Sequence, residues 1–168
     1  LVAVVDVDVQ KAERIAAQFN CRPAGRLSDV IDSIDVATVA VPTVHHEEVA
    51  GSLIDRGIPV LIEKPMAPDS ASARRMLERA RKHGVPIQIG HSERFNPVVI
   101  TLQRMQVSPR FIETHRISPF TFRSADIGVV MDMMIHDIDV VLSLVRAKPV
   151  QVDAIGVRVL ARHEDVAN

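Results

Sequence analysis

Short apolar runs alternate with helical patterns along the first 90 residues of the chain. The apolar runs, which are rich in Val and Ile, occupy residues 1–5, 36–41, 58–62 and 85–90. The stretches between them repeat apolar residues with the period of an amphipathic helix, at residues 9–19, 27–34, 47–56 and 70–83. Because strands that alternate with helices form parallel sheets covered on both faces, this pattern predicts an α/β fold with a doubly wound parallel sheet.

Single residues are expected to fix the ends and faces of these helices. Asp8 is placed to cap the first helix, whose residues Ile15, Ala16 and Phe19 are expected to face inward. Gly84 follows the last of these helices and is the expected stop, because glycine readily takes the left-handed conformation that ends a helix.

The pattern changes after residue 91. Helices are predicted at 97–105 and 128–145, and alternating apolar residues predict strands at 110–117 and 150–160. Strands without a helical crossover between them form antiparallel sheets. We therefore predict a first domain over residues 1–91 and a second over 92–168, an α+β domain with a mainly antiparallel open sheet.

The composition excludes several classes of protein. Hydrophobic residues make up 47% of the 168 residues and the formal net charge is −1, as in a soluble globular protein. No basic cluster interleaved with aromatic residues indicates a nucleic-acid partner, and no apolar stretch has the length of a membrane span. The single cysteine, Cys21, rules out an internal disulfide and favours a reducing compartment, so we expect the cytoplasm.

The Glu63-Lys64-Pro65 sequence comes directly after a predicted buried strand. Ligands of open α/β sheets bind beyond the carboxyl ends of the strands, so Lys64 is placed to donate a hydrogen bond or to transfer a proton. The alternative is an ordinary solvated lysine at a strand end.

Three polar residues share one stripe of the predicted helix at 128–145. Asp132, His136 and Asp139 are spaced i, i+4 and i+7 in an otherwise apolar segment, whereas Asp137 points elsewhere. Such a stripe fits a metal site, a histidine satisfied within the core, or a general acid/base histidine oriented by a carboxylate.

Three motifs, taken in order, carry a family resemblance. Glu63-Lys64-Pro65, then Gly90-His-Ser-Glu-Arg-Phe-Asn-Pro97, then Asp132-xxx-His136-xx-Asp139 resemble the Gfo/Idh/MocA family of NAD(P)-dependent sugar dehydrogenases. The resemblance implies that Lys64, Asp132 and His136 are the catalytic residues, that Asp132 and His136 also contact substrate, and that no metal is used. It further implies a Rossmann domain and a second domain that supports a homo-oligomer, a dimer or a tetramer.

Other site residues are implied by the same resemblance. The cofactor-binding set is Asp6, Pro42, Thr43, His46, Glu63 and Lys64. Asp6 would bind the adenosine ribose and favour NAD, with NADP as the alternative. Arg94 and Asn96 would line the substrate entrance, and Arg116 and Arg123 are weaker candidates for an anionic substrate group.

One element of the family pattern is missing. No G-x-G-x-x-G occurs, although in the family a glycine-rich turn precedes the strand that corresponds to residues 1–5. We therefore expect a chain truncated at both ends, which lacks the first βα unit of its Rossmann domain and part of its second domain, and which binds dinucleotide poorly.

The expected activity is hydride transfer between a sugar hydroxyl carbon and nicotinamide. Residues 116–123 and 130–139 resemble the nucleotide-sugar branch of the family, which includes UDP-N-acetylglucosamine 3-dehydrogenases. An inositol or free-sugar dehydrogenase, a non-catalytic NAD(H)-binding regulatory protein, and an inactive fragment are the alternatives.

Overall fold

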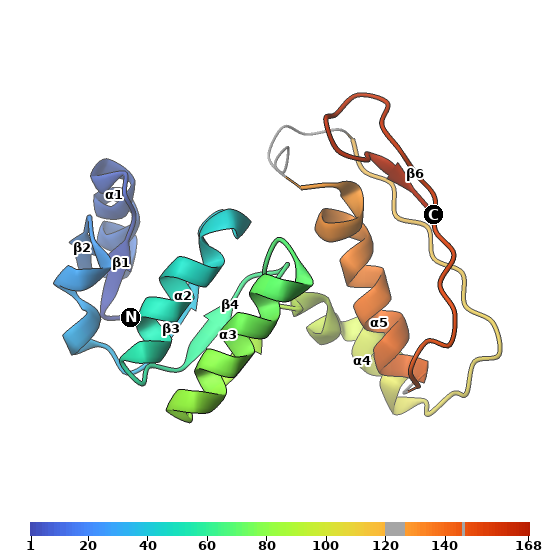
Figure 1. Cartoon of the computed structure of the whole chain (residues 1–168), viewed down its shortest axis with the longest axis horizontal. Helices are drawn as coiled ribbons and strands as arrows, with labels where there is room; N and C mark the ends of the chain where they lie inside the picture. Colours follow the sequence, from blue (N-terminus) through green and yellow to red (C-terminus); the bar gives the residue numbers. More distant parts are fainter. Residues whose placement is uncertain (120–126, 146) are drawn as a thin grey trace. The chain divides into compact units, whose positions relative to one another are not determined.

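The computed structural model describes residues 1–119, 127–145 and 147–168, and it divides into two compact units (Figure 1). The first unit contains residues 1–62 and 71–88, and the second contains residues 63–70 and 89–168. The boundary expected from the sequence, between residues 91 and 92, stays a prediction about domains. None of the helices in the described ranges is long and apolar enough to cross a membrane.

Short strands and helices alternate through the first part of the chain. In order they are β1 (Ala3–Val5), α1 (Val9–Phe19), β2 (Arg22–Ala24), the 3₁₀ turns η1 (Leu27–Asp29) and η2 (Ile31–Ser33), β3 (Ala37–Val39), η3 (Thr43–His45), α2 (His46–Asp55), β4 (Val60–Ile62), α3 (Ser70–His83) and β5 (Ile87–Ile89). The rest of the chain forms η4 (Ser92–Phe95), α4 (Pro97–Arg104), the π-helical turn η6 (Val130–Met134), α5 (Ile135–Val145), β6 (Gly156–Val157) and β7 (Val166–Ala167).

Parallel pairing is confirmed in two separate sheets. β1 and β2 pair in parallel, from Ala3 opposite Arg22 to Val5 opposite Ala24. β3 and β4 pair in parallel within a three-stranded sheet of order β3-β4-β5. The sequence pattern did not predict β2, because the run Arg22-Pro23-Ala24 lacks the large apolar residues of the other strands.

Large apolar side chains of α2, α3 and β4 fill the core of the first unit. Leu53, Ile54, Ile62 and Met76 are almost completely buried. The contact between α1 and its sheet is made instead by the small residues Ala12 and Ala16. The inward orientation predicted for Phe19 is wrong, since its side chain is 60% exposed at the last position of α1, just before the chain turns away at Asn20.

Capping residues mark the starts and ends of the helices largely as the sequence predicted. The Asp8 side chain accepts a hydrogen bond from the backbone N–H of Lys11 at 3.1 Å, which caps α1. Gly57 and Gly84 follow α2 and α3 with φ of +77° and +66°, a conformation that glycine adopts without strain. These caps explain why α1 and α3 begin and end at the predicted residues.

The second unit differs more from the sequence prediction. The helix expected at 128–145 begins with the π-helical turn η6, and only Ile135–Val145 is α-helical. The strand expected at 110–117 is wrong, because residues 110–119 form no regular structure and Phe111 and Ile117 stay exposed.

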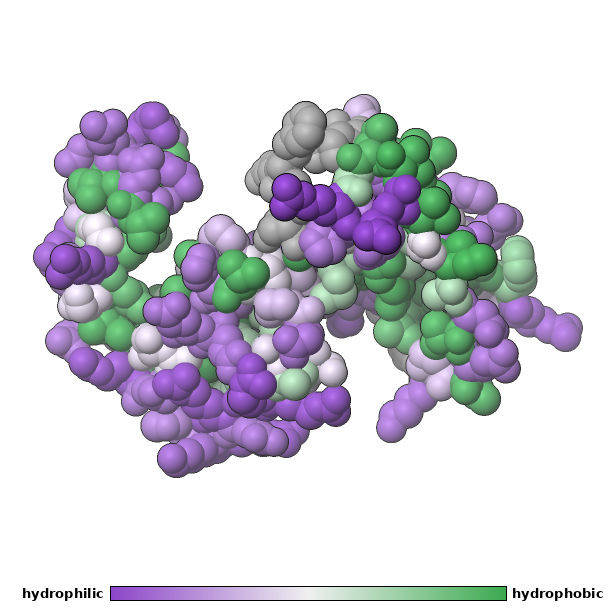
Figure 2. All heavy atoms as spheres, turned by 45° about the horizontal axis from the view of Figure 1, so that its top comes forward, coloured by the Kyte–Doolittle hydropathy of each residue, from purple (hydrophilic) through white to green (hydrophobic). Residues whose placement is uncertain are grey.

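The final strand is correspondingly short. Of the residues expected to form it, 150–160, only Gly156–Val157 pair, antiparallel to Val166–Ala167. Apolar residues of the same segment are exposed, and hydrophobic residues are visible on the surface of the second unit in Figure 2. Alternation marks a strand only where another strand supplies the ladder hydrogen bonds, and the described residues offer no such partner along most of this segment.

Replacing the cap of α1 tests how far a local signal sets the first unit. Asp8→Ala removes the acceptor for the Lys11 N–H, and we expect a loss of about 0.5–2 kcal/mol in the free energy of unfolding. Urea unfolding followed by circular dichroism measures it. Asp35→Ala, at an exposed position of the same unit, is the matched control and should change stability by less than about 0.5 kcal/mol. Equal effects of the two substitutions would contradict the capping role.

Candidate active site

Lys64 lies two residues beyond the end of β4 and is held by Asp132. Its Nζ donates to the Oδ1 carboxylate atom and to the backbone carbonyl oxygen of Asp132, both at 2.8 Å. The Lys64 side chain is only 18% exposed. A freely solvated lysine, the alternative left open by the sequence, is therefore excluded, and two residues separated by 67 others in the chain form one ion pair.

Asp132 is presented by the π-helical turn η6. In a π-helix the backbone hydrogen bonds reach one residue further than in an α-helix, and single π-turns inside helices often mark functional sites. Here the turn places both the carboxylate and the carbonyl oxygen of Asp132 against the same ammonium group. His136 follows in the first turn of α5.

His136 is held in a setting that favours its neutral form. Its Nδ1 atom is buried and has no hydrogen-bond partner. Burial lowers the pKa of the imidazole below its ordinary value, and the charges of Lys64, Arg116 and His91 lower it further, whereas Glu93 opposes them. A neutral imidazole is the form that can accept a proton.

Asp139, one turn after His136, is buried and bound by Arg94. The Arg94 guanidinium donates from Nε to Oδ2 at 2.6 Å and from its terminal NH₂ to Oδ1 at 2.5 Å. His91 Nδ1 lies 3.8 Å from Oδ1. Burial opposes ionisation of the Asp139 carboxyl, but the hydrogen bonds from Arg94 and the charge of His91 outweigh it and lower the pKa.

The predicted substrate-binding residues Arg94 and Asn96 both have partners within the second unit. Asn96 caps α4 by accepting from the Val98 N–H at 3.0 Å, and its amide donates to Glu93 at 3.0 Å. Because Arg94 is bound to Asp139, the structure gives both residues a positioning contact, and their contact with substrate stays a prediction.

The two weaker arginine candidates are placed differently. Arg116 donates to the carboxylate of Asp137, at 2.8 Å for the shortest contact. Arg123 lies outside the described residues.

Glu63 lies against the backbone of Gly90. A Cβ atom at Gly90 would come within 3.1 Å of the Glu63 carboxylate, closer than side chains normally approach. The absence of a side chain at Gly90 therefore lets the glutamate lie beside the end of β5.

The predicted cofactor residues of the first unit follow β1 and β3. Asp6 accepts from the Asp8 N–H at 3.0 Å and pairs with Lys11 at 2.6 Å. The hydrogen bond from Lys11 lowers the pKa of Asp6, so the carboxyl is ionised.

The other three predicted cofactor residues of this unit, Pro42, Thr43 and His46, lie between the end of β3 and the start of α2. Pro42 immediately precedes η3, and Thr43 in its first position is buried. His46 is 1% exposed and its Nε2 lies 2.9 Å from the Val41 carbonyl oxygen, to which it donates. Their contact with cofactor stays a prediction.

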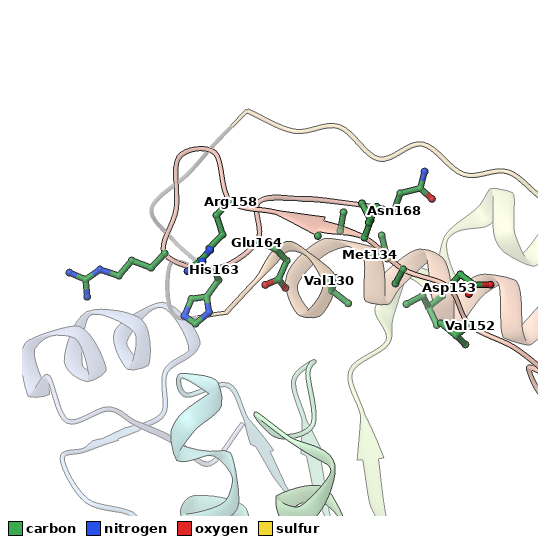
Figure 3. Close-up of a pocket in the computed structure, with 14 residues that line it drawn as sticks. Val130, Met134, Val152, Asp153, Arg158, His163, Glu164 and Asn168 are labelled. Carbon is green, nitrogen blue, oxygen red and sulfur yellow. The ribbon is translucent and has the colours of Figure 1, made fainter.

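A cavity of about 710 Å³ in the second unit was not predicted from the sequence. It lies between the η6–α5 helix and the C-terminal hairpin formed by β6 and β7 (Figure 3). Val130, Met134 and Ile138 line it from the helix, and Arg158, His163 and Glu164 from the hairpin side. Neither Lys64 nor His136 lines it, so the cavity is distinct from the ion pair. In the described residues no three His, Cys, Asp or Glu side chains gather where they could hold a metal ion.

Comparison with known proteins places the chain in a class. A family model described as an oxidoreductase family with an NAD-binding Rossmann fold matches residues 1–91, so the chain is an oxidoreductase-family protein of Rossmann type. Within that class it belongs to the Gfo/Idh/MocA family.

Similar proteins act on sugars and inositol. The chain is 34% identical over 168 residues to a UDP-N-acetylglucosamine 3-dehydrogenase of Acidithiobacillus ferrooxidans, with coverage of 99% of this chain and 54% of the relative. A myo-inositol dehydrogenase of Streptomyces leeuwenhoekii is 31% identical over 163 residues, with coverage of 90% and 50%. The chain thus spans about half the length of the curated relatives it matches.

Solved structures agree on the fold. The A. ferrooxidans enzyme superposes with a TM-score of 0.91 over 99% of this chain and 55% of the other. GenD2 from gentamicin A biosynthesis, solved in complex with NAD, superposes with a TM-score of 0.83 at 24% identity over 99% of this chain and 53% of the other. The second likeness supports the fold.

Removing Arg94 tests whether it holds the buried carboxylate of Asp139. Arg94→Gln leaves that carboxylate without its bidentate partner, and we expect a loss toward the lower end of the roughly 3–5 kcal/mol typical of a broken buried pair, because Arg94 is half exposed. The folded pKa of Asp139 lies below the ordinary 3.8, so its stabilising pairing is present above about pH 4 and is lost as the pH falls below that value.

Urea unfolding at neutral pH and at about pH 3 measures this pH dependence. The difference between the parent and Arg94→Gln should shrink in acid. Arg104→Gln, at an exposed arginine that ends α4, is the matched control and should change little at either pH. A deficit of the same size at both pH values would show that Asp139 is not the partner that matters.

Proposed function

We propose that the protein is an NAD(P)-dependent dehydrogenase that oxidises a CH–OH group of a sugar or nucleotide sugar, with UDP-N-acetylglucosamine as the first substrate to test. The proposal rests on the Lys64–Asp132 ion pair and on His136 in the next turn, whose lowered pKa favours the neutral imidazole. An ammonium group and a proton acceptor brought together by a carboxylate suit the oxidation of an alcohol.

His136, Lys64 and Asp132 have different roles in removing the substrate proton. His136 accepts the hydroxyl proton of the substrate, since burial and nearby positive charge keep the imidazole unprotonated. Lys64 donates a hydrogen bond to the same oxygen and stabilises the negative charge that develops there. Asp132 holds the ammonium group in position at 2.8 Å. NAD, when bound, supplies the acceptor for the hydride.

The first unit offers groups that suit a dinucleotide. The ionised carboxylate of Asp6 can accept hydrogen bonds from ribose hydroxyls, because each oxygen has two acceptor positions and the structure uses them only in part. Lys11 lies beside that carboxylate and offsets its charge. The repulsion of a ribose 2′-phosphate is thereby weakened, so we keep NADP as the alternative cofactor. The proposed cofactor-binding set is completed by Pro42, Thr43, His46, Glu63 and Lys64.

The likeness to the A. ferrooxidans enzyme over 99% of this chain supports the nucleotide-sugar substrate. Oxidation of inositol is the second candidate, and it is supported by inositol dehydrogenases of Streptomyces leeuwenhoekii and Corynebacterium glutamicum at 31% and 29% identity. A cytoplasmic location and a homo-oligomer are further parts of the proposal, taken from the reducing compartment that a single cysteine favours and from the family resemblance.

Kinetics of the full gene product test the proposal. With NAD supplied, we expect UDP-N-acetylglucosamine or myo-inositol to drive formation of NADH, which is followed by its absorbance. Lys64→Ala and His136→Ala should each lower kcat by about 10²–10⁴-fold, the usual contribution of a positioned proton-transfer group, while NAD still binds.

Two matched variants control for the loss of any lysine or histidine in the second unit. Lys148→Ala and His115→Ala change side chains at exposed positions and should turn over like the parent. Turnover by Lys64→Ala and His136→Ala at the rate of these controls would refute the acid/base assignment. Binding of NAD without oxidation of any sugar or inositol would instead favour a binding protein.

A further inference from the structure

Two imidazole nitrogens in the second unit are buried without a hydrogen-bond partner. They are Nδ1 of His136 and Nδ1 of His91, and within the described residues no other buried side-chain nitrogen or oxygen is without one. An unsatisfied buried polar atom destabilises the folded state, so a pair of them needs an explanation. Since Nδ1 of His136 is buried, the proposed substrate is reached through the other ring nitrogen, Nε2.

Both imidazoles act on the carboxylate of Asp139, whose pKa their charges lower. His136 and Asp139 are three residues apart and lie on the same face of the helix. Nδ1 of His91 is 3.8 Å from Asp139 Oδ1, too far for a hydrogen bond and close enough for an ion-pair contact. Arg94 fixes the carboxylate through two short hydrogen bonds. The carboxylate is thus held where it can stabilise a positive charge on either imidazole.

His91 also has a route to solvent. Its side chain is 24% exposed although its Nδ1 is buried, so one part of the ring faces inward and another reaches water. A proton that arrives at the buried nitrogen can therefore leave from the opposite side of the ring.

We propose that His91 is a proton-relay residue, which takes from Nδ1 of His136 the proton released when the substrate is oxidised and passes it to solvent beside Asp139. The inference rests on the proposed function for the source of the proton. Because neither Nδ1 atom has a hydrogen-bond partner, the proposed transfer runs through one bridging water between them.

The protons balance over one turnover. The O–H bond of the substrate breaks and its proton goes to Nε2 of His136, which then carries protons on both nitrogens. The Nδ1 proton of His136 passes to the bridging water, that water gives one of its own protons to Nδ1 of His91, and His91 releases its Nε2 proton to solvent. After the product leaves, both rings regain their starting tautomers by exchange with water.

The charged groups around His136 come from several segments. Lys64 and Asp132 form the ion pair beside it, Arg116 and Glu93 act on it with opposite sign, and Asp139 follows one turn later. His91 also acts on His136, and it is an imidazole whereas those groups are not, so coupling between the two rings can be measured separately from the effect of those charges.

A titration of the full gene product with isotope-labelled histidines tests the relay without any substrate. By NMR, the imidazole of His136 in the parent should titrate with a pKa below its ordinary value. Replacing His91 by Gln should shift the titration of His136 to higher pH, because one positive neighbour is removed, and His115→Gln should leave it unchanged. A His136 titration curve that is the same in the parent and in His91→Gln would overturn the relay.

Turnover provides the second test. His91→Gln should lower kcat, by up to about 10²-fold, with the KM for the oxidised sugar unchanged, and added imidazole should restore part of kcat in His91→Ala. If the parent oxidises its substrate and both His91 variants keep the parent's kcat and pH profile, the relay is refuted while the proposed function stands. If the parent oxidises nothing, the proposed function fails, and the titration still decides whether the two rings are coupled.

Discussion

The second unit depends on the ion pair between Lys64 and Asp132. It joins the segment that leaves β4 to the helical turn η6, which comes much later in the chain. Both side chains are partly buried, so the charges are less screened than those of a surface pair, and each needs the other. Any change that weakens the pair therefore also disturbs the position of His136 in the following turn.

The charges around this pair are arranged by sign. Burial lowers the pKa of His136 and nearby positive groups lower it further, whereas the pKa of Asp139 is lowered because Arg94 binds its carboxylate in spite of burial. One helix thus carries a neutral base and a fixed anion within a single turn. An arrangement in which neighbouring groups have their pKa values pushed in defined directions is typical of sites that move protons.

Local signals explain how much of the fold could be predicted. The bounds of α1 and α3 follow from a capping aspartate and a glycine stop, and buried strands such as β4 follow from short runs of large apolar residues. β2 was not predicted because Pro23 interrupts an already short strand. The strand expected at 110–117 failed because alternation does not say whether a partner strand exists.

Only part of the candidate site could be predicted from the sequence. The motifs indicated which residues to examine, but spacing along a regular helix could not reveal the π-helical turn that lets Asp132 bind Lys64 through two oxygens. The contact between His91 and Asp139 is also a long-range one, and it carries no periodic signal. Pairings of this kind depend on tertiary packing and not on local propensity.

The central claim is that Lys64 and His136 act on one substrate oxygen. A crystal structure of the full gene product with NAD and the sugar it oxidises tests this claim most directly. We predict that Nζ of Lys64 and Nε2 of His136 both lie within hydrogen-bond distance, about 2.6–3.2 Å, of the hydroxyl to be oxidised. A bound sugar whose reacting hydroxyl contacts neither nitrogen would contradict the account.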